Sequence, residues 1–121
     1  MTRVLLVEND SLCRAEVADI LGEHGFEVRQ ARDGAEALRL LGDAPAPDVI
    51  LLDLVTPVMD GWGFRRAQSA DPRYSGIPVV LMSGLPDLSS QARALGAAGH
   101  LRKPFSLQAL LESVTTPVHD H

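Results

Sequence analysis

The 121-residue sequence lacks several features, and each absence narrows the classes of protein to which it can belong. A single cysteine, Cys13, excludes an internal disulfide framework. The sequence has no run rich in lysine and arginine, and its net charge is -5. Direct nucleic-acid binding is therefore not expected, because that affinity rests largely on cationic contacts to phosphate. No glycine-rich nucleotide-binding motif follows a predicted strand.

Long apolar segments are also missing. No stretch approaches the length of a membrane span, and the polar run that begins at Glu8 leaves no room for the apolar region of a signal peptide. Hydrophobic residues make up 45% of the chain and charged residues 22%, which favours a folded core over disorder. We expect one cytoplasmic domain spanning residues 1–121, with a core of about 3–116 and a short tail of 117–121.

Short aliphatic runs alternate with amphipathic stretches along the chain. The runs predict five strands, at residues 4–7, 26–31, 49–52, 77–82 and 99–102. Helical spacing predicts helices at about 11–24, after Asp33-Gly34, after Asp60, at 88–95 and after Ser106, the last ending at Pro117. This alternation predicts an α/β fold: a (βα)5 doubly wound, five-stranded parallel sheet with helices on both faces.

The strand order decides which side chains meet. The first, third and fourth runs are the most aliphatic and belong at the centre of the sheet, which favours the order 2-1-3-4-5. Open α/β sheets bind ligands at the carboxyl ends of their strands. Four predicted strands end in polar residues there: Glu8-Asn9-Asp10, Asp53, Ser83 and Lys103.

These strand ends suit phosphoryl transfer to a carboxylate. Asp53 offers a nucleophile, Lys103 a fixed positive charge and Ser83 a hydroxyl donor. Neighbouring acidic groups repel unless a cation lies between them, and a hard divalent ion such as Mg2+ prefers oxygen ligands. Together these groups would stabilise the negative charge that a transferring phosphoryl group spreads over its oxygens.

Four motifs make the sequence resemble the receiver domains of two-component response regulators. They are Val7-Glu8-Asn9-Asp10, Leu52-Asp53-Leu54-Val55-Thr56-Pro57-Val58-Met59-Asp60-Gly61, Leu81-Met82-Ser83-Gly84 and Lys103-Pro104-Phe105. They stand in the family's order at similar intervals, and the resemblance covers residues from about Arg3 to Val114. The family's flavodoxin-like fold has the strand order 2-1-3-4-5.

The resemblance implies a role for each residue of the site. Asp53 would be the phosphoacceptor and Ser83 the switch hydroxyl, and Lys103 would correspond to the family's invariant lysine. The Mg2+ ligands would be Glu8, Asn9, Asp53 and the backbone carbonyl of Val55. The chain would not be an enzyme, beyond catalysing its own phosphorylation and dephosphorylation.

The resemblance also implies partners. A sensor histidine kinase or a phosphotransfer protein would donate the phosphoryl group to Asp53. The fourth helix, the fifth strand and the fifth helix would then shift and alter the surface offered to a downstream protein or effector domain. No membrane partner is expected, and whether the chain forms a homodimer stays open.

Two positions depart from the family pattern. Asn9 stands where the second metal-binding acid is usual, and its amide oxygen coordinates without adding charge, so we expect weaker Mg2+ binding and slower or less stable phosphorylation. Asp10 is a substitute ligand or, as we favour, the cap of the helix that follows. His100 stands at the family's usual Tyr or Phe switch position, either as a packing residue or as a group that titrates near neutral pH. The interval from Ser83 to Lys103 is about two residues short.

Two other functions compete with this interpretation. A phosphorylation-independent pseudo-receiver, acting as an interaction scaffold, would explain Asn9 and His100. A phosphatase of the haloacid dehalogenase type would need a second aspartate two residues after Asp53, where this chain has Val55. We therefore favour the phospho-accepting receiver.

Overall fold

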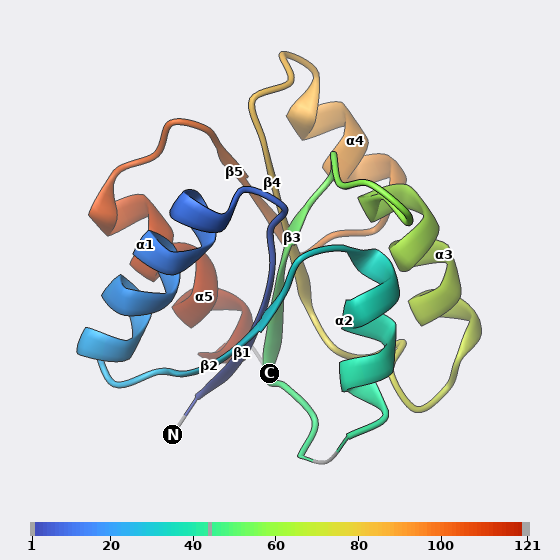
Figure 1. Cartoon of the computed structure of the whole chain (residues 1–121). Helices are drawn as coiled ribbons and strands as arrows, with labels where there is room; N and C mark the ends of the chain where they lie inside the picture. Colours follow the sequence, from blue (N-terminus) through green and yellow to red (C-terminus); the bar gives the residue numbers. More distant parts are fainter. Residues whose placement is uncertain (1, 44, 120–121) are drawn as a thin grey trace.

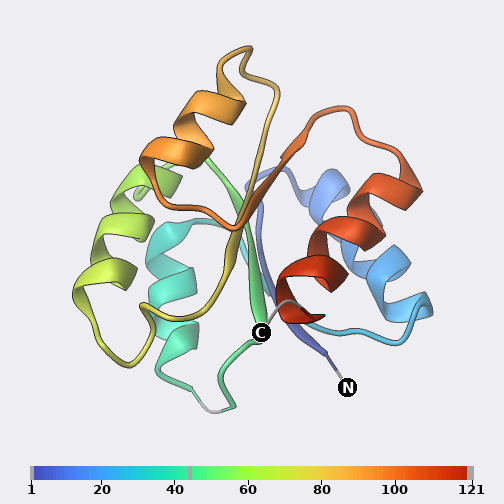
Figure 2. The same ribbon diagram turned by 180° about the vertical axis from the view of Figure 1, so that it is seen from behind.

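The computed structural model describes residues 2–43 and 45–119. Five parallel strands form one sheet in the order β2-β1-β3-β4-β5, which confirms the predicted fold class and strand order. Helices α1 and α5 cover one face of the sheet, and α2, α3 and α4 cover the other (Figures 1 and 2).

The predicted strands match the observed ones to within two residues at each end. The strands are β1 (Arg3–Val7), β2 (Glu27–Ala31), β3 (Val49–Asp53), β4 (Val79–Ser83) and β5 (Gly99–Arg102). The helices are α1 (Ser11–Glu23), α2 (Gly34–Leu41), α3 (Gly61–Ala70), α4 (Leu88–Ala94) and α5 (Leu107–His119). Among the described helices, none is long and apolar enough to cross a membrane.

The central strands are buried on both faces, which explains their unbroken aliphatic sequences. Successive side chains of a strand point to opposite faces. In β3, Ile50 and Leu52 therefore pack toward α2, α3 and α4, whereas Val49 and Leu51 pack toward α1 and α5. The edge strand β2 is mostly exposed, as its mixed polar sequence predicts.

Side-chain caps begin most of the helices where the sequence predicts them. The Asp10 carboxylate accepts hydrogen bonds from the backbone N–H groups at the start of α1, so the capping interpretation of Asp10 is confirmed. Asp60 caps α3 through the N–H of Gly63, and Ser106 accepts from the N–H of Ala109. These caps fix where the chain leaves each strand end.

The prediction that Pro117 ends the last helix is wrong. Helix α5 continues to His119 with Pro117 inside it, so the expected tail of 117–121 is helical as far as 119, and residues 120 and 121 lie outside the described part. Proline cannot donate to the carbonyl four residues earlier, which normally disrupts a helix. Here the proline is buried close to the end of the helix, where burial of its ring offsets one missing hydrogen bond.

Candidate functional site

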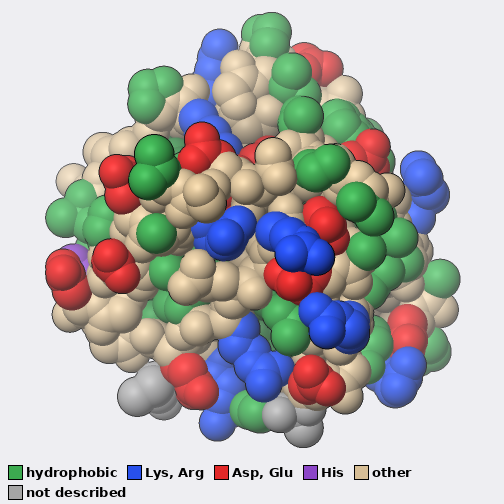
Figure 3. Space-filling model, viewed as in Figure 1, with side chains coloured by type: hydrophobic (Ala, Val, Ile, Leu, Met, Phe, Trp, Pro, Cys, Tyr) green, Lys and Arg blue, Asp and Glu red, His purple; other side chains and the backbone are tan. Residues whose placement is uncertain are grey.

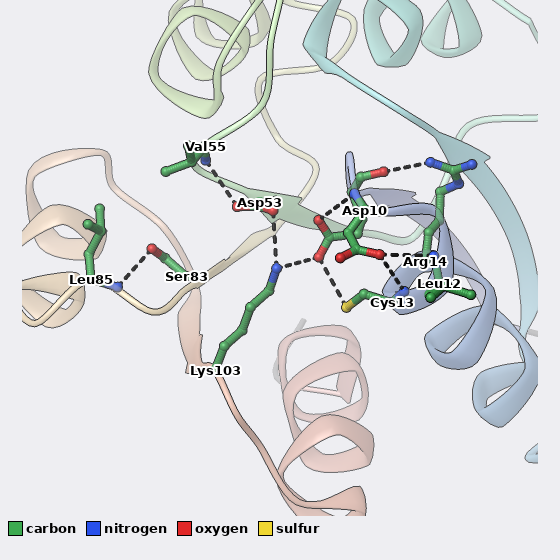
Figure 4. A network of polar contacts seen from close by, with 10 residues as sticks. Asp10, Leu12, Cys13, Arg14, Asp53, Val55, Ser83, Leu85 and Lys103 are labelled. Carbon is green, nitrogen blue, oxygen red and sulfur yellow. Dashed lines mark hydrogen bonds and ion pairs between the residues drawn. The ribbon is translucent and has the colours of Figure 1, made fainter.

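The parallel register brings the four polar strand ends to one edge of the sheet. Glu8 directly follows β1, Asp53 and Ser83 end β3 and β4, and Lys103 directly follows β5. The Nζ atom of Lys103 donates to Oε1 of Glu8 and lies 3.1 Å from Oδ2 of Asp53 (Figure 4). One ammonium group thus bridges two carboxylates that come from strands far apart in sequence.

Glu8 is almost completely buried, with 1% of its surface exposed. Besides Lys103, its carboxylate accepts hydrogen bonds from Sγ of Cys13 at 3.2 Å and from the backbone N–H of Asp10 at 3.3 Å. Burial alone would raise the pKa of Glu8, but the neighbouring Asp53, Lys103 and Cys13 side chains hold this pKa below its ordinary value. Glu8 is therefore the more firmly ionised carboxylate of the pair.

Asp53 is the more weakly acidic carboxylate. Burial, and then the nearby Glu8 carboxylate, raise the pKa of Asp53 to about 6, although the N–H of Val55 and the charge of Lys103 oppose this shift. The Val55 N–H donates to Oδ1 of Asp53 at 3.0 Å, and Lys103 donates to Oδ2, so each oxygen has one donor. Near neutral pH the site holds two negative charges and one positive charge, a balance that favours binding a further cation.

Lys103 is fixed at both its backbone and its ammonium group. Its backbone N–H donates to the carbonyl of Ser83 at 2.9 Å, which ties the end of β5 to the end of β4. Burial would lower the pKa of Lys103, but Glu8 and Asp53 outweigh burial and raise it. The ammonium group therefore stays charged over the whole range in which Asp53 titrates.

Ser83 and Cys13 lie on opposite sides of Asp53 (Figure 4). The Ser83 hydroxyl oxygen accepts a hydrogen bond from the backbone N–H of Leu85 at 3.0 Å, and 3% of the residue is exposed. The hydroxyl group thus shapes the loop that leads into α4, and its own proton remains available for donation.

A close backbone contact shapes the loop after Asp53. Gly61 donates its N–H to the carbonyl of Leu54 at 3.0 Å. A Cβ atom on Gly61 would lie only 2.8 Å from Cα of Leu54 and 3.1 Å from the carbonyl oxygen of Asp53. The Asp-Gly pair of the motif is therefore explained by packing: the aspartate caps α3, and only glycine fits beside the strand end.

Three other residues named from the sequence are exposed. The Asn9 side chain is exposed, and no hydrogen bond to it is found within residues 2–43 and 45–119. Val55 is 61% exposed. His100 points outward from β5 and lines a groove of about 470 Å³ against α5, so the packing interpretation of His100 does not describe its position.

Cys13 is a site neighbour that the sequence did not reveal. Its helical spacing suggested a small core residue, yet it is half-buried and its thiol donates to Glu8. Burial, and then the Glu8 carboxylate, raise the pKa of Cys13 to about 11, so the sulfur remains a protonated donor. The contact arises because α1 folds back beside the end of β1, a tertiary arrangement that residue spacing does not encode.

The donor atoms at this edge of the sheet are oxygens. Over the described ranges, no group of three or more His, Cys, Asp and Glu side chains is placed to hold a metal ion. The oxygen donors at this edge are the carboxylates of Glu8 and Asp53 and the adjacent backbone of Val55, with Asn9 as a neutral amide. These are hard oxygen ligands of the kind that Mg2+ prefers, so the chemistry fits, with one negative charge fewer than an all-acid set would supply.

Acidic and basic side chains are intermixed on the face of the molecule that Figure 3 shows. Several arginines pair with nearby acids, such as Arg3 with Glu27 and Arg39 with Glu36. The absence of direct nucleic-acid binding stays a prediction from the net charge.

Comparison with known proteins supports the resemblance. The family profile of the response regulator receiver domain matches residues 4–115. The transcriptional regulatory protein PdtaR of Mycobacterium tuberculosis is 35% identical over 117 residues, which are 96% of this chain and 56% of that protein. The sensor histidine kinase TmoS of Ectopseudomonas mendocina is 34% identical over 115 residues, which are 93% of this chain and 12% of that protein.

A solved structure agrees as well. The chemotaxis response regulator CheY4 of Vibrio cholerae has a TM-score of 0.87 and 34% identity, covering 97% of this chain and 98% of that one. This chain spans about half the length of PdtaR and a smaller part of TmoS, so in both relatives the matching region is one part of a longer protein. With the matching fold, motifs and profile, the chain belongs to the receiver domain family of the response regulators of two-component signalling.

Proposed function

We propose that Asp53 accepts a phosphoryl group from the phosphohistidine of a sensor histidine kinase or a phosphotransfer protein, in a reaction that depends on Mg2+. One observation carries this proposal: Asp53 is a buried carboxylate held between the Val55 N–H and the Lys103 ammonium, at the carboxyl edge of the sheet. A nucleophile beside a fixed positive charge in a largely buried site suits this transfer.

The transfer forms one bond and breaks one. An oxygen of the Asp53 carboxylate attacks phosphorus, the P–N bond of the phosphohistidine breaks, and the histidine nitrogen keeps the electron pair and takes up a proton. Lys103 offsets the negative charge of the phosphoryl oxygens, and the Ser83 hydroxyl donates to one of them. The chain would thus catalyse its own phosphorylation and dephosphorylation and no other reaction.

Mg2+ would be held by Glu8, Asn9, Asp53 and the backbone carbonyl of Val55. A bound divalent ion supplies positive charge that draws the phosphoryl oxygens to the site. Because Asn9 is neutral, we expect the affinity for Mg2+ to be weaker than in the Asn9→Asp variant. Saturation of a calorimetric Mg2+ titration at lower concentration in Asn9→Asp than in wild type supports this ligand set, and equal affinities contradict the role of Asn9.

Phosphorylation would switch a protein-binding surface formed by α4, β5 and α5, with His100 and Ser83 as its switch residues. A downstream protein or effector domain, or a second copy of the chain, would bind this surface in the cytoplasm. The match to a sensor histidine kinase and to a transcriptional regulator supports partners of these two kinds. As the sequence predicts, we propose that residues 1–121 act as one receiver domain.

A second candidate is a pseudo-receiver that acts as a scaffold without phosphorylation. The observation that favours it is the exposed Asn9 side chain, to which the described residues make no hydrogen bond. This candidate predicts no saturable Mg2+ binding and the same partner affinity for wild type and Asp53→Asn.

A phosphodonor experiment separates the two candidates. The chain is incubated with acetyl phosphate and Mg2+, and its intact mass is measured for wild type, Asp53→Asn and Asp19→Asn, whose aspartate is exposed on α1. We expect one phosphoryl adduct in wild type and Asp19→Asn and none in Asp53→Asn. The absence of an adduct in wild type at saturating donor and Mg2+ contradicts the proposed function and supports the scaffold.

A further inference from the structure

Helix α4 is joined to α3 by two side-chain hydrogen bonds. The indole N–H of Trp62, in the first turn of α3, donates to Oε1 of Gln91 on α4 at 2.9 Å. Nε of Arg65 donates to the carbonyl of Leu95, the C-cap residue directly after α4, at 2.9 Å. Both donors come from α3, and the two acceptors lie on α4 and at its C-cap.

The two bonds differ in how firmly each is supported. Arg65 also donates to the side chains of Gln68 and Ser69 on its own helix, and Gln68 is fully buried. Gln91, by contrast, is supported by an exposed bond in which its Nε2 donates to Oδ2 of Asp87 at 2.9 Å. The Arg65 contact is therefore the stronger anchor, and the Trp62–Gln91 contact can be broken with less rearrangement.

The other polar contacts at the start of α4 are local ones, such as the bond from the Leu88 N–H to the carbonyl of Leu85 at 3.3 Å. Asp87 is its N-cap residue, yet within the described part of the chain its side chain makes no capping hydrogen bond, because its carboxylate binds Gln91. The preceding loop depends on the bond from the Leu85 N–H to the Ser83 hydroxyl. The position of this end of α4 thus depends on the buried side chain of Leu88, on a hydroxyl of the site and on one indole.

The Trp62–Gln91 contact is also connected to Asp53 through the backbone. Trp62 directly follows Gly61, whose backbone packs against Leu54 and the carbonyl of Asp53. The indole is therefore attached to a segment that cannot shift without disturbing Asp53. Two routes connect the acceptor with α4, one through Trp62 and the other through Ser83 and Leu85.

We propose that the Trp62–Gln91 hydrogen bond is a latch that holds the start of α4 against α3, and that phosphorylation opens it while Arg65 keeps the end of α4 in place. The inference rests on the proposed function. When Ser83 turns its hydroxyl toward a phosphoryl oxygen on Asp53, the bond from Leu85 is lost, and α4 pivots about Leu95. The bond from Trp62 to Gln91 then breaks.

The latch makes a quantitative prediction for the protein without phosphate. A neutral hydrogen bond of this kind contributes a factor of about 2 to 12 to an equilibrium constant. Gln91→Leu, which removes the acceptor from a half-exposed site, should therefore favour the open form by this factor before any phosphate is added. Gln108→Leu is the matched control, because Gln108 is exposed on α5 and bonds only Glu112 among the residues described.

The experiment combines three measurements on the whole chain, with and without acetyl phosphate and Mg2+. Intact mass reports the adduct on Asp53, the emission of Trp62 reports the latch because it is the only tryptophan of the sequence, and amide exchange reports the opening of residues 88–94. We expect the adduct in wild type to change the Trp62 emission and to speed exchange in α4. In Gln91→Leu without donor, exchange in α4 should already be about 2- to 12-fold faster.

The outcomes separate the latch from the proposed function. An adduct that forms in wild type without a change in Trp62 emission overturns the latch and leaves the proposed function standing. Equal α4 exchange in wild type, Gln91→Leu and Gln108→Leu without donor also overturns it. If wild type forms no adduct, the proposed function fails and the phosphate-dependent opening fails with it.

Discussion

Helices α3 and α4 follow neighbouring strands, and each begins near a residue of the site, yet they are attached in different ways. Helix α3 starts with an Asp60 cap and with Gly61 packed directly against the backbone of β3. Helix α4 spans Leu88–Ala94, lacks a side-chain cap within the described residues, and is held by side-chain contacts. The comparison indicates that the fold holds the chain firmly after Asp53 and leaves the chain after Ser83 more adjustable.

The largest effect should come from adding one methyl group beside β3. Gly61→Ala places a Cβ atom 2.8 Å from Cα of Leu54, so we expect the free energy of unfolding to fall by about 2–3 kcal/mol. Gly84→Ala, in the loop before α4, meets nothing closer than 3.9 Å and should change it by less than about 0.5 kcal/mol. Urea denaturation measures both, and equal losses would remove the distinction between the two helices.

The next largest effect on the free energy of unfolding should come from the carboxylate charge of Asp53. The pKa of Asp53 is raised to about 6 from an ordinary value of 3.8, so the folded protein favours the protonated carboxyl. The stability linked to this group is complete below the ordinary pKa and is lost as the pH rises through 6. Asp53→Asn should therefore raise the free energy of unfolding by about 1–2 kcal/mol at pH 8, after allowing for the lost Lys103 contact.

This gain should shrink as the pH falls. At pH 4 the aspartate of the folded wild type is protonated and resembles asparagine, so the difference between the two proteins should approach zero. Urea denaturation at both pH values measures the change, and a gain independent of pH would contradict the raised pKa of Asp53.

The helix caps provide a direct test of the comparison. Asp60→Ala removes a capping bond to Gly63 and should lower the free energy of unfolding by about 1 kcal/mol. Asp87→Ala removes only the exposed contact to Gln91, so a loss of a few tenths of a kcal/mol is expected. Thermal denaturation of the two variants measures both losses. A larger loss of stability in Asp87→Ala than in Asp60→Ala would contradict the view that α3 is held more firmly than α4.

A further small effect should come from Val58, in the loop between β3 and α3. Its φ angle of 65° lies in the left-handed region, which is strained for a β-branched residue, and its side chain is 87% exposed. Val58→Gly should raise the free energy of unfolding by about 0.5 kcal/mol, because relief of strain exceeds the entropy lost by glycine. A loss of stability on urea denaturation would mean that the valine makes contacts that outweigh the strain.

The sequence predicted the sheet order and the residues at its carboxyl edge, because aliphatic runs and strand ends are local features. It did not predict the contact of Cys13 with Glu8 or that of Trp62 with Gln91, which depend on how separate helices pack. Pro117 was misplaced for a similar reason: local helix preference ended the helix, whereas burial of the proline in the fold lets it continue.

The central claim is that the phosphoryl group is attached to Asp53 and to no other aspartate. Borohydride reduces an acyl phosphate to an alcohol, so treating the phosphorylated chain and sequencing its peptides by mass spectrometry reads the position directly. We predict homoserine at position 53 and intact aspartate at positions 48 and 60. Homoserine at another position, or none in a chain saturated with donor and Mg2+, would contradict the account.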